Sequence, residues 1–304
     1  MRTRFRPDHQ LTTRMLITSF LLLIVYAAFV FALVWLIKSV VIVVLIAGGL
    51  LAAQFWFSDR IALAAMHAQI VTPEQEPYLH GIVDRLCATA DMPKPRIAIS
   101  NDDMPNAFAT GRSTKRAVLC VTTGIMRRLN EEELEGVLAH ELSHVAHSDV
   151  MVMTAASFIG VLAGLVARFS LYSTMFGGGR DRRDGGQLAL ILLLVMAVSG
   201  AVYAISYLLI RALSRYRELA ADRAGAILTG RPSALASALT KVTQDIKRIP
   251  TRDLRAATAF NAFFFAPALG PGAVMANLFS THPTLEKRLD QLAQLSTQLG
   301  QPTV

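Results

Sequence analysis

Cysteine is scarce in this chain of 304 residues, and charged residues are few. The two cysteines, Cys87 and Cys120, can form at most one disulfide, which excludes a disulfide-stapled domain and a metal site built from cysteine. Charged residues make up 17% of the chain, against about 25% in a typical soluble domain, whereas apolar residues make up 53%. These figures exclude disordered and collagen-like chains and favour a membrane protein.

The first long apolar run extends from Leu16 to Phe57 and is interrupted by a single charge, Lys38. As helix, a run of this length would span about 63 Å, close to twice the roughly 30 Å of a bilayer core. We therefore predict two transmembrane helices, near 16–36 and 40–57. The run is too long for a signal peptide, and no small-residue cleavage site is present.

A second pair of apolar runs, 151–176 and 188–210, flanks a loop at 177–187 that is rich in glycine and arginine. Each run is long enough to cross a bilayer, so we predict a second hairpin. The alternative is a helical pair that packs on the protein without crossing lipid, which the arginines of the loop favour. Arginines before the first run place the N-terminus in the cytoplasm, and an even number of crossings keeps both polar regions there.

The predicted organisation alternates membrane and polar parts. The parts are an N-terminal arm and hairpin at 1–57, the first half of a cytoplasmic domain at 58–150, a second hairpin at 151–210, and the second half of the domain at 211–304. Short strand patterns occur at 95–100, 106–109 and 117–122. One helical pattern begins at Pro73, and three others cover 221–228, 233–246 and 284–299. We predict an α+β membrane protein, mostly helical, with four transmembrane helices and a small β-sheet.

A helix that carries metal-binding chemistry begins at Asn130, where the spacing to Glu133 predicts a capping box. His140 and His144 lie four residues apart on this helix, so both imidazoles share one face and can bind one ion. Glu141 projects about 100° around the helix, where it can reach a metal-bound water without binding the metal. Two neutral imidazoles, a carboxylate and an open position for water suit zinc.

The third ligand must come from elsewhere in the chain. His147 is unsuitable, because a rigid helix places it about 10 Å along the axis from His140. Glu218 is the better candidate, and Asp222, one turn later, is placed to hold a ligand histidine through its other ring nitrogen. The alternative is that both carboxylates lie on a helix surface and pair with neighbouring arginines.

Together these motifs resemble the HtpX-like membrane metalloproteases. The matching stretches are Asp59-Arg60, Met66-His67-Ala68, Pro105 to Gly111, Thr123 to Ile125, His140 to Asp149, Glu218 to Asp222 and Thr281-His282-Pro283. The resemblance implies a zincin-like catalytic domain that binds one zinc ion through His140, His144 and Glu218, with Glu141 as general base. It also implies a protein of the bacterial inner membrane, with a cytoplasmic catalytic face, that serves protein quality control and the stress response. The predicted spans make this protein multi-pass, with both termini cytoplasmic.

The expected function is that of a membrane zinc endopeptidase that cleaves misfolded or damaged membrane proteins. His282, which the resemblance places near the site, is a candidate oxyanion donor; a loop histidine before a helix start is the equal alternative. Asn106, Ala107, Phe108 and Ala109 are candidate substrate-binding residues, because an edge strand can add the substrate as a further strand. A plain loop is the alternative for this segment.

Two other functions share parts of this pattern. A prenyl-protein processing peptidase has the same helix motif, but four predicted spans argue against its larger membrane chamber. A non-catalytic scaffold pinned by zinc would not need Glu141. The net charge of +8, from 30 basic and 22 acidic residues, points to lipid headgroups as partners. No basic stretch is interleaved with aromatic residues, so no nucleic-acid partner is expected.

Overall fold

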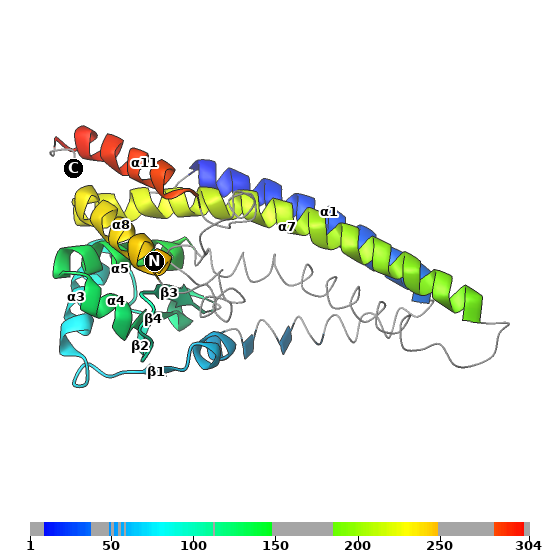
Figure 1. Ribbon diagram of the computed structural model, residues 1–304, viewed down its shortest axis with the longest axis horizontal. Helices are drawn as coiled ribbons and strands as arrows, with labels where there is room; N and C mark the ends of the chain where they lie inside the picture. The colour runs from blue at the N-terminus through cyan, green and yellow to red at the C-terminus, as the bar shows by residue number, and fades with distance from the viewer. Residues whose placement is uncertain are drawn as a thin grey trace. The chain divides into compact units, whose positions relative to one another are not determined.

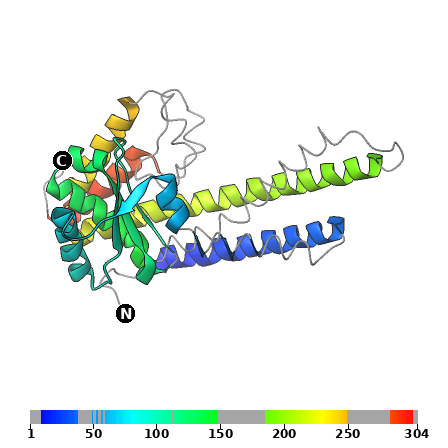
Figure 2. The same ribbon diagram turned by 90° about the horizontal axis from the view of Figure 1, so that it is seen from below.

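The computed structural model describes residues 9–37, 49, 52–53, 56–57, 59–111, 113–147, 185–248 and 283–300. Most of the predicted helix at 40–57, the whole predicted helix at 151–176, and His282 lie outside these residues. Figures 1 and 2 show the elements in two views. They are α1 (His9–Ile37), β1 (Ala68–Ile70), α3 (Pro77–Ala90), β2 (Arg96–Ser100), β3 (Ala107–Thr110), η1 (Thr114–Arg116), β4 (Val118–Thr122), α4 (Thr123–Arg128), α5 (Glu131–Ala146), α7 (Gly185–Thr229), α8 (Pro232–Arg248) and α11 (Leu285–Gln298).

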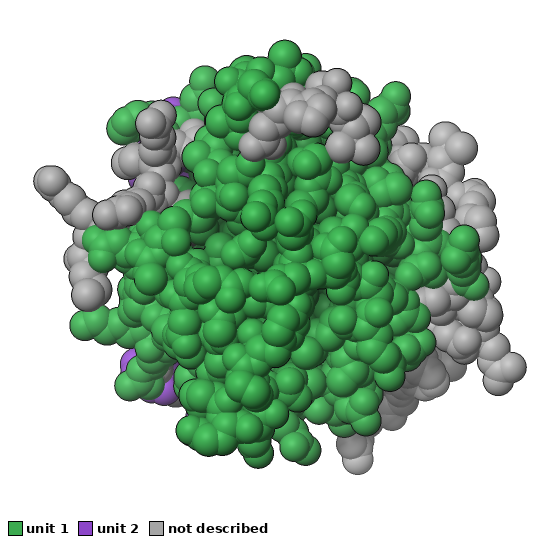
Figure 3. Space-filling view, turned by 90° about the vertical axis from the view of Figure 1, so that its left-hand side faces the viewer, with its two compact units in different colours: residues 1–11, 58–151, 214–304 green, residues 12–57, 152–213 purple. Residues whose placement is uncertain are grey.

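The chain divides into two compact units. Residues 1–11, 58–151 and 214–304 form unit 1, and residues 12–57 and 152–213 form unit 2 (Figure 3). Unit 1 is therefore assembled from three stretches that are far apart in the sequence, and it contains the strands and the helices that carry the predicted site.

In unit 2, α1 packs along α7, and the two helices run side by side in Figures 1 and 2. Both helices contain a segment long and apolar enough to cross a membrane, His9–Trp35 and Leu193–Thr229. The α1 side of the contact repeats at intervals of four, three and four residues, as in a heptad seam, through Leu22, Tyr26, Phe29 and Leu33. Large apolar side chains outside the seam, such as Phe20 and Phe31, are exposed, as expected of a lipid-facing surface.

The helix predicted at 221–228 is not a separate element. It is the end of α7, which continues unbroken from the predicted membrane segment at 188–210 to Thr229. No proline or glycine lies between 201 and 224, so nothing in this stretch interrupts the helical hydrogen bonds. The predicted helices at 233–246 and 284–299 are confirmed as α8 and α11.

The sheet of unit 1 has four strands in the order β1-β2-β4-β3. The central pair β2–β4 is parallel, and the outer pairs are antiparallel. Strand patterns at 95–100, 106–109 and 117–122 are confirmed as β2, β3 and β4, and β3 lies at an edge. Strand β1 was not predicted, because three residues are too few to show an alternating pattern.

Both faces of the sheet are covered, and the side chains alternate between two clusters. Ile97, Leu119 and Val121 join the main core with α3, α5 and α8. Ala98, Val118 and Cys120 face the other way, with Phe108, and pack against Ala62 and Met66. Burial without a charged partner raises the pKa of Cys120 to about 12, so this thiol is an inert core residue.

The helix predicted to open at Pro73 begins later, at Pro77. The backbone of Glu76 is non-helical, with φ −135° and ψ 66°, because the proline ring that follows disfavours the helical conformation of the preceding residue. Pro77 itself fits the first turn, where its missing N–H would have no helical partner. Residues 73–75 form a turn instead.

Candidate metal centre

Helix α5 begins with the predicted capping box. Asn130 Oδ1 accepts a hydrogen bond from Glu133 N at 2.9 Å, and Glu133 Oε2 accepts one from Asn130 N at 3.0 Å. The same carboxylate accepts from Ser237 Oγ at 2.6 Å and from Lys241 Nζ at 2.8 Å, both on α8. Burial acts to raise the pKa of Glu133, but these hydrogen bonds outweigh it and lower the pKa. The start of α5 is thus held both to its own first turn and to α8.

Helix α7 crosses α5 at Gly225, next to His140. A Cβ atom at this position would lie 2.8 Å from the backbone nitrogen of His140, closer than any side chain tolerates. The absence of a side chain at Gly225 therefore allows the backbones to meet here. Glu218 and Asp222 precede Gly225 by two turns and one turn, so the same crossing brings both carboxylates to the histidines of α5.

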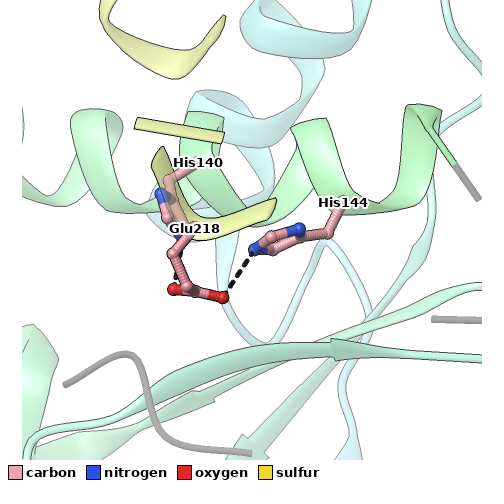
Figure 4. Close-up of side chains that lie close together, drawn as sticks. All are labelled: His140, His144 and Glu218. Carbon is pink, nitrogen blue, oxygen red and sulfur yellow. Dashed lines mark ion pairs between the residues drawn. The ribbon is translucent and has the colours of Figure 1, made fainter. Parts of the chain in front are cut away.

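Three potential ligand groups converge at this crossing (Figure 4). Glu218 Oε2 lies 3.6 Å from His140 Nε2, and Glu218 Oε1 lies 3.5 Å from His144 Nε2. One ligand atom from each of the three residues can be chosen so that all lie within 4.8 Å of one another, and all three side chains are buried. The two imidazole rings are nearly perpendicular, at 89°.

This arrangement fits a metal ion of zinc-like size. A tetrahedral ion with bonds of about 2.0–2.1 Å holds its ligand atoms about 3.4 Å apart, close to the distance from each histidine Nε2 to the Glu218 oxygen that faces it. Two imidazole nitrogens and one carboxylate oxygen leave a fourth position for water. The alternative that Glu218 and Asp222 lie on a helix surface is wrong, since both are buried.

The remaining ring nitrogens of the two histidines face opposite charges. His140 Nδ1 lies 2.9 Å from Asp222 Oδ1. His144 Nδ1 lies 3.4 Å from Arg217 Nη2. Burial acts to lower the pKa of His140, but the hydrogen bonds to Asp222 and Glu218 together raise it. The contact of Asp222 agrees with its predicted role, whereas Arg217 was not expected here.

Glu141 is buried beside the three ligand groups. Its Oε2 accepts a hydrogen bond from the backbone nitrogen of Ala109 on β3 at 3.1 Å. Burial is the main cause of a raised pKa at this carboxyl group. A raised pKa makes the carboxylate a stronger proton acceptor, which is the property required of a general base.

The other predicted residues have varied positions. Within the segment 106–109, Ala109 contacts the site through Glu141, and the backbone nitrogen of Asn106 donates to Thr122 Oγ1 at 2.9 Å, on the β4 side. His147 ends α5 as its C-terminal cap, and its Nδ1 lies 2.8 Å from Ser143 O, as expected for a residue outside the ligand set. His282 is not among the described residues.

A second residue at the centre, besides Arg217, was missed. Arg288 of α11 is 2% exposed, and it donates two hydrogen bonds of 2.6 Å to the carboxylate of Asp222. A signal was present in the sequence: Arg288, Leu292 and Leu295 repeat at intervals of four and three residues, so the arginine occupies a core-facing position of an amphipathic helix.

Comparison with known proteins identifies the family. The model of Peptidase family M48 matches residues 73–296. The chain belongs to peptidase family M48. The chain is 64% identical to "Protease HtpX homolog 1" of Streptomyces coelicolor, over 99% of this chain and 98% of that protein. It is 49% identical to "Protease HtpX homolog" of Moorella thermoacetica, over 98% and 99% of the two chains.

The crystal structure of S. mikatae Ste24p matches with a TM-score of 0.47 and 16% identity, and the match covers 94% of this chain and 66% of that one.

The predicted resemblance to HtpX-like proteases is therefore confirmed, and this M48 chain is a membrane metalloprotease. The enzyme assignment makes the scaffold alternative wrong. Family membership implies a metal cofactor and protein substrates, and the His140, His144 and Glu218 group is where the described residues can bind such a metal.

Proposed function

We propose that this M48 protease is a zinc endopeptidase of the bacterial inner membrane that cleaves misfolded or damaged membrane proteins at the cytoplasmic face. The observation that carries the proposal is the buried group of two imidazoles and one carboxylate at distances that suit one tetrahedral ion. His140, His144 and Glu218 are the proposed ligands, one zinc ion per chain, and Asp222 orients His140. Bound zinc would lower the pKa of its water and polarise the scissile carbonyl.

Glu141 is the proposed general base. Its carboxylate accepts a proton from the attacking water and then transfers that proton to the leaving amine. The hydrogen bond from Ala109 N to Glu141 Oε2 supports this role. It holds the carboxylate close to the three ligand groups without making it a fourth ligand. His282 remains the proposed donor to the oxyanion.

The edge strand β3 is the proposed substrate-binding element. In an antiparallel strand, backbone N–H groups alternate between the two sides. The nitrogen of Asn106 points towards β4, so those of Ala107 and Ala109 point outward, and Ala109 N is directed at Glu141. A substrate strand added along 106–109 would pass the general base and be recognised mainly through its backbone. Such recognition suits unfolded segments of varied sequence.

The membrane arrangement proposed for this protein has four spans in two hairpins, with the predicted parts 1–57, 58–150, 151–210 and 211–304. The two long apolar helices α1 and α7 support it. A reporter fused within 177–187 should be found outside the cytoplasm, whereas reporters at either terminus should be cytoplasmic. A cytoplasmic reporter at 177–187 would contradict the second hairpin.

The test of the chemistry is Glu141→Gln in the full-length protein purified in detergent. Cleavage of an unfolded membrane protein should fall by at least about 100-fold, the usual contribution of a general base. Zinc content, measured by elemental analysis, should stay at one ion per chain. Glu132→Gln is the matched control, because this exposed carboxylate lies on the first turn of the same helix.

Unchanged cleavage by the Glu141→Gln protein would refute the general base. A wild-type protein that neither contains nor takes up zinc would refute the zinc site. A prenylated peptide assayed beside the unfolded protein tests the remaining alternative, and preference for the prenylated peptide would support it over the proposal.

A further inference from the structure

A line of buried charges connects the C-terminal helix α11 to the proposed metal ligand His140. Arg288 Nε donates to Asp222 Oδ2 and Arg288 Nη2 donates to Asp222 Oδ1, each at 2.6 Å. Asp222 Oδ1 in turn lies 2.9 Å from His140 Nδ1. The side chains of Arg288, Asp222 and His140 are 2%, 0% and 1% exposed, so water does not screen this chain of contacts.

The two parallel bonds from the guanidinium fix the plane of the Asp222 carboxylate as well as its charge. A buried carboxylate without a positive partner is costly, and it would become protonated or turn away. In either case the imidazole of His140 would lose a fixed, charged acceptor for its Nδ1–H. Acceptors of this kind set the orientation and the basicity of metal-binding histidines.

The placement of Arg288 on α11 also indicates a role beyond packing. Arg288 shares one helix face with the buried residues Leu292 and Leu295. An apolar residue at this position would fill the same face without a desolvation penalty, and buried ion pairs are often no more stabilising than apolar contacts. A contribution to folding stability alone is therefore not a sufficient reason for an arginine at position 288.

We propose that Arg288 is a positioning residue of the metal centre, acting on His140 through Asp222, so that docking of α11 completes the zinc site. The inference rests on the zinc site proposed above. It makes the affinity for metal depend on a helix that contributes no ligand.

A second contact between α11 and α7 provides the matched control. Gln291 Nε2 donates to the carbonyl oxygen of Leu219 at 2.8 Å, next to Glu218 in the chain. This bond also holds α11 on α7, but it does not involve the carboxylate of Asp222. Loss of the Gln291 bond tests the effect of helix docking in general. Loss of Arg288 tests the positioning of His140 through Asp222.

The experiment measures Zn²⁺ affinity by competition with a chelator, in the full-length protein in detergent. Arg288→Met should weaken Zn²⁺ binding by about 10- to 100-fold, the range found for residues that support metal ligands. Arg288→Lys should recover only part of the loss, because an ammonium cannot form both parallel bonds. Gln291→Ala should stay within about threefold of wild type. Wild-type affinity in the Arg288→Met protein would overturn the inference.

A double variant separates the positioning of His140 through Asp222 from a purely structural effect of Arg288. Asp222→Asn with Arg288→Met removes both charges, so the protein should fold even if Arg288→Met alone does not. Added to Asp222→Asn, the Arg288→Met change should weaken Zn²⁺ binding no further, because its route to His140 is already cut. A further tenfold loss would show that Arg288 acts by another route.

Stability gives the readout that a structural role would not reproduce. The melting temperature should fall in Arg288→Met and recover in the double variant, whereas Zn²⁺ affinity should not recover. Recovery of both together would overturn the inference. Failure of the wild-type protein to bind Zn²⁺ would instead refute the proposed function, so the two failures are distinguishable.

Discussion

The two histidines of α5 occupy equivalent positions in their motif but different surroundings. Both Nε2 atoms face Glu218, at 3.6 and 3.5 Å. On the other side of the rings, His140 faces the carboxylate of Asp222, and His144 faces the guanidinium of Arg217. Helical spacing makes the two residues alike towards the metal, and the neighbouring helix makes them unlike behind it. The two histidines therefore make similar contacts on the metal side of their rings and different contacts, to Asp222 and Arg217, on the other side.

The largest effect is expected when either histidine ligand is removed. His140→Ala and His144→Ala should each lower the bound zinc to near zero, and proteolysis should fall by about 1,000-fold or more, because two ligands cannot hold the ion in place. His147→Ala, at the end of the same helix, should keep one zinc per chain. Elemental analysis and a cleavage assay provide the measurements. Loss of zinc in His147→Ala would mean that the ligand set is wrong.

The next effect tests the asymmetry directly. Asp222→Asn should weaken zinc binding by about 10- to 100-fold, because His140 loses its charged acceptor. Arg217→Met should leave the affinity unchanged or increase it, because a guanidinium can only donate hydrogen bonds and adds positive charge near the ion. Chelator competition on both proteins measures the contrast. Equal losses in the two proteins would show that both contacts support the ligands alike.

A smaller effect is expected at the helix crossing. Gly225→Ala places a Cβ atom 2.8 Å from the backbone of His140, so α7 must move away from α5. We expect a loss of about 1–3 kcal/mol in unfolding free energy, typical of overpacking, and weaker zinc binding. Gly81→Ala on α3 is the control, since a Cβ there meets nothing within 4 Å. Its helix should be stabilised by up to about 1 kcal/mol. Thermal melts of both variants distinguish the two outcomes.

The smallest effect should change the stability of α5 and leave the two histidines equally able to bind the ion. Glu133→Gln removes a charged cap from the start of α5 and should cost about 1 kcal/mol of unfolding free energy at pH 7. The folded structure lowers the pKa of Glu133, so its stabilising contribution is present above the pKa of the unfolded state. That contribution disappears as the pH falls through the folded pKa.

Denaturant titrations at several pH values measure this change. The difference between wild type and Glu133→Gln should shrink as the solution becomes acidic, because the wild-type carboxylate becomes protonated and loses its charge-assisted bonds. Zinc affinity of the folded protein should be the same in both. A difference that grows on acidification would contradict the assigned direction of the pKa shift.

Local patterns sufficed where the interaction is local. The two residues of the α5 capping box are three positions apart and the two histidines are four apart, so helix geometry alone determines their relation. The long apolar runs likewise predicted α1 and the first part of α7. The start of α3 was predicted wrongly at Pro73, although the restriction that Pro77 places on Glu76 was a local signal for the later start.

The amino-acid sequence by itself determined which side chains share a helical face, where α5 begins and which segments are apolar enough for a membrane, because these depend on neighbours within a few residues. Only the tertiary structure decided that Asp222 supports His140, that Arg217 faces His144, and that Arg288 reaches Asp222. These partners are separated by more than sixty positions along the chain, and their contact depends on how closely α7 crosses α5 and where α11 packs. Helical periodicity carries no information over that separation, whereas the packing of buried surfaces does.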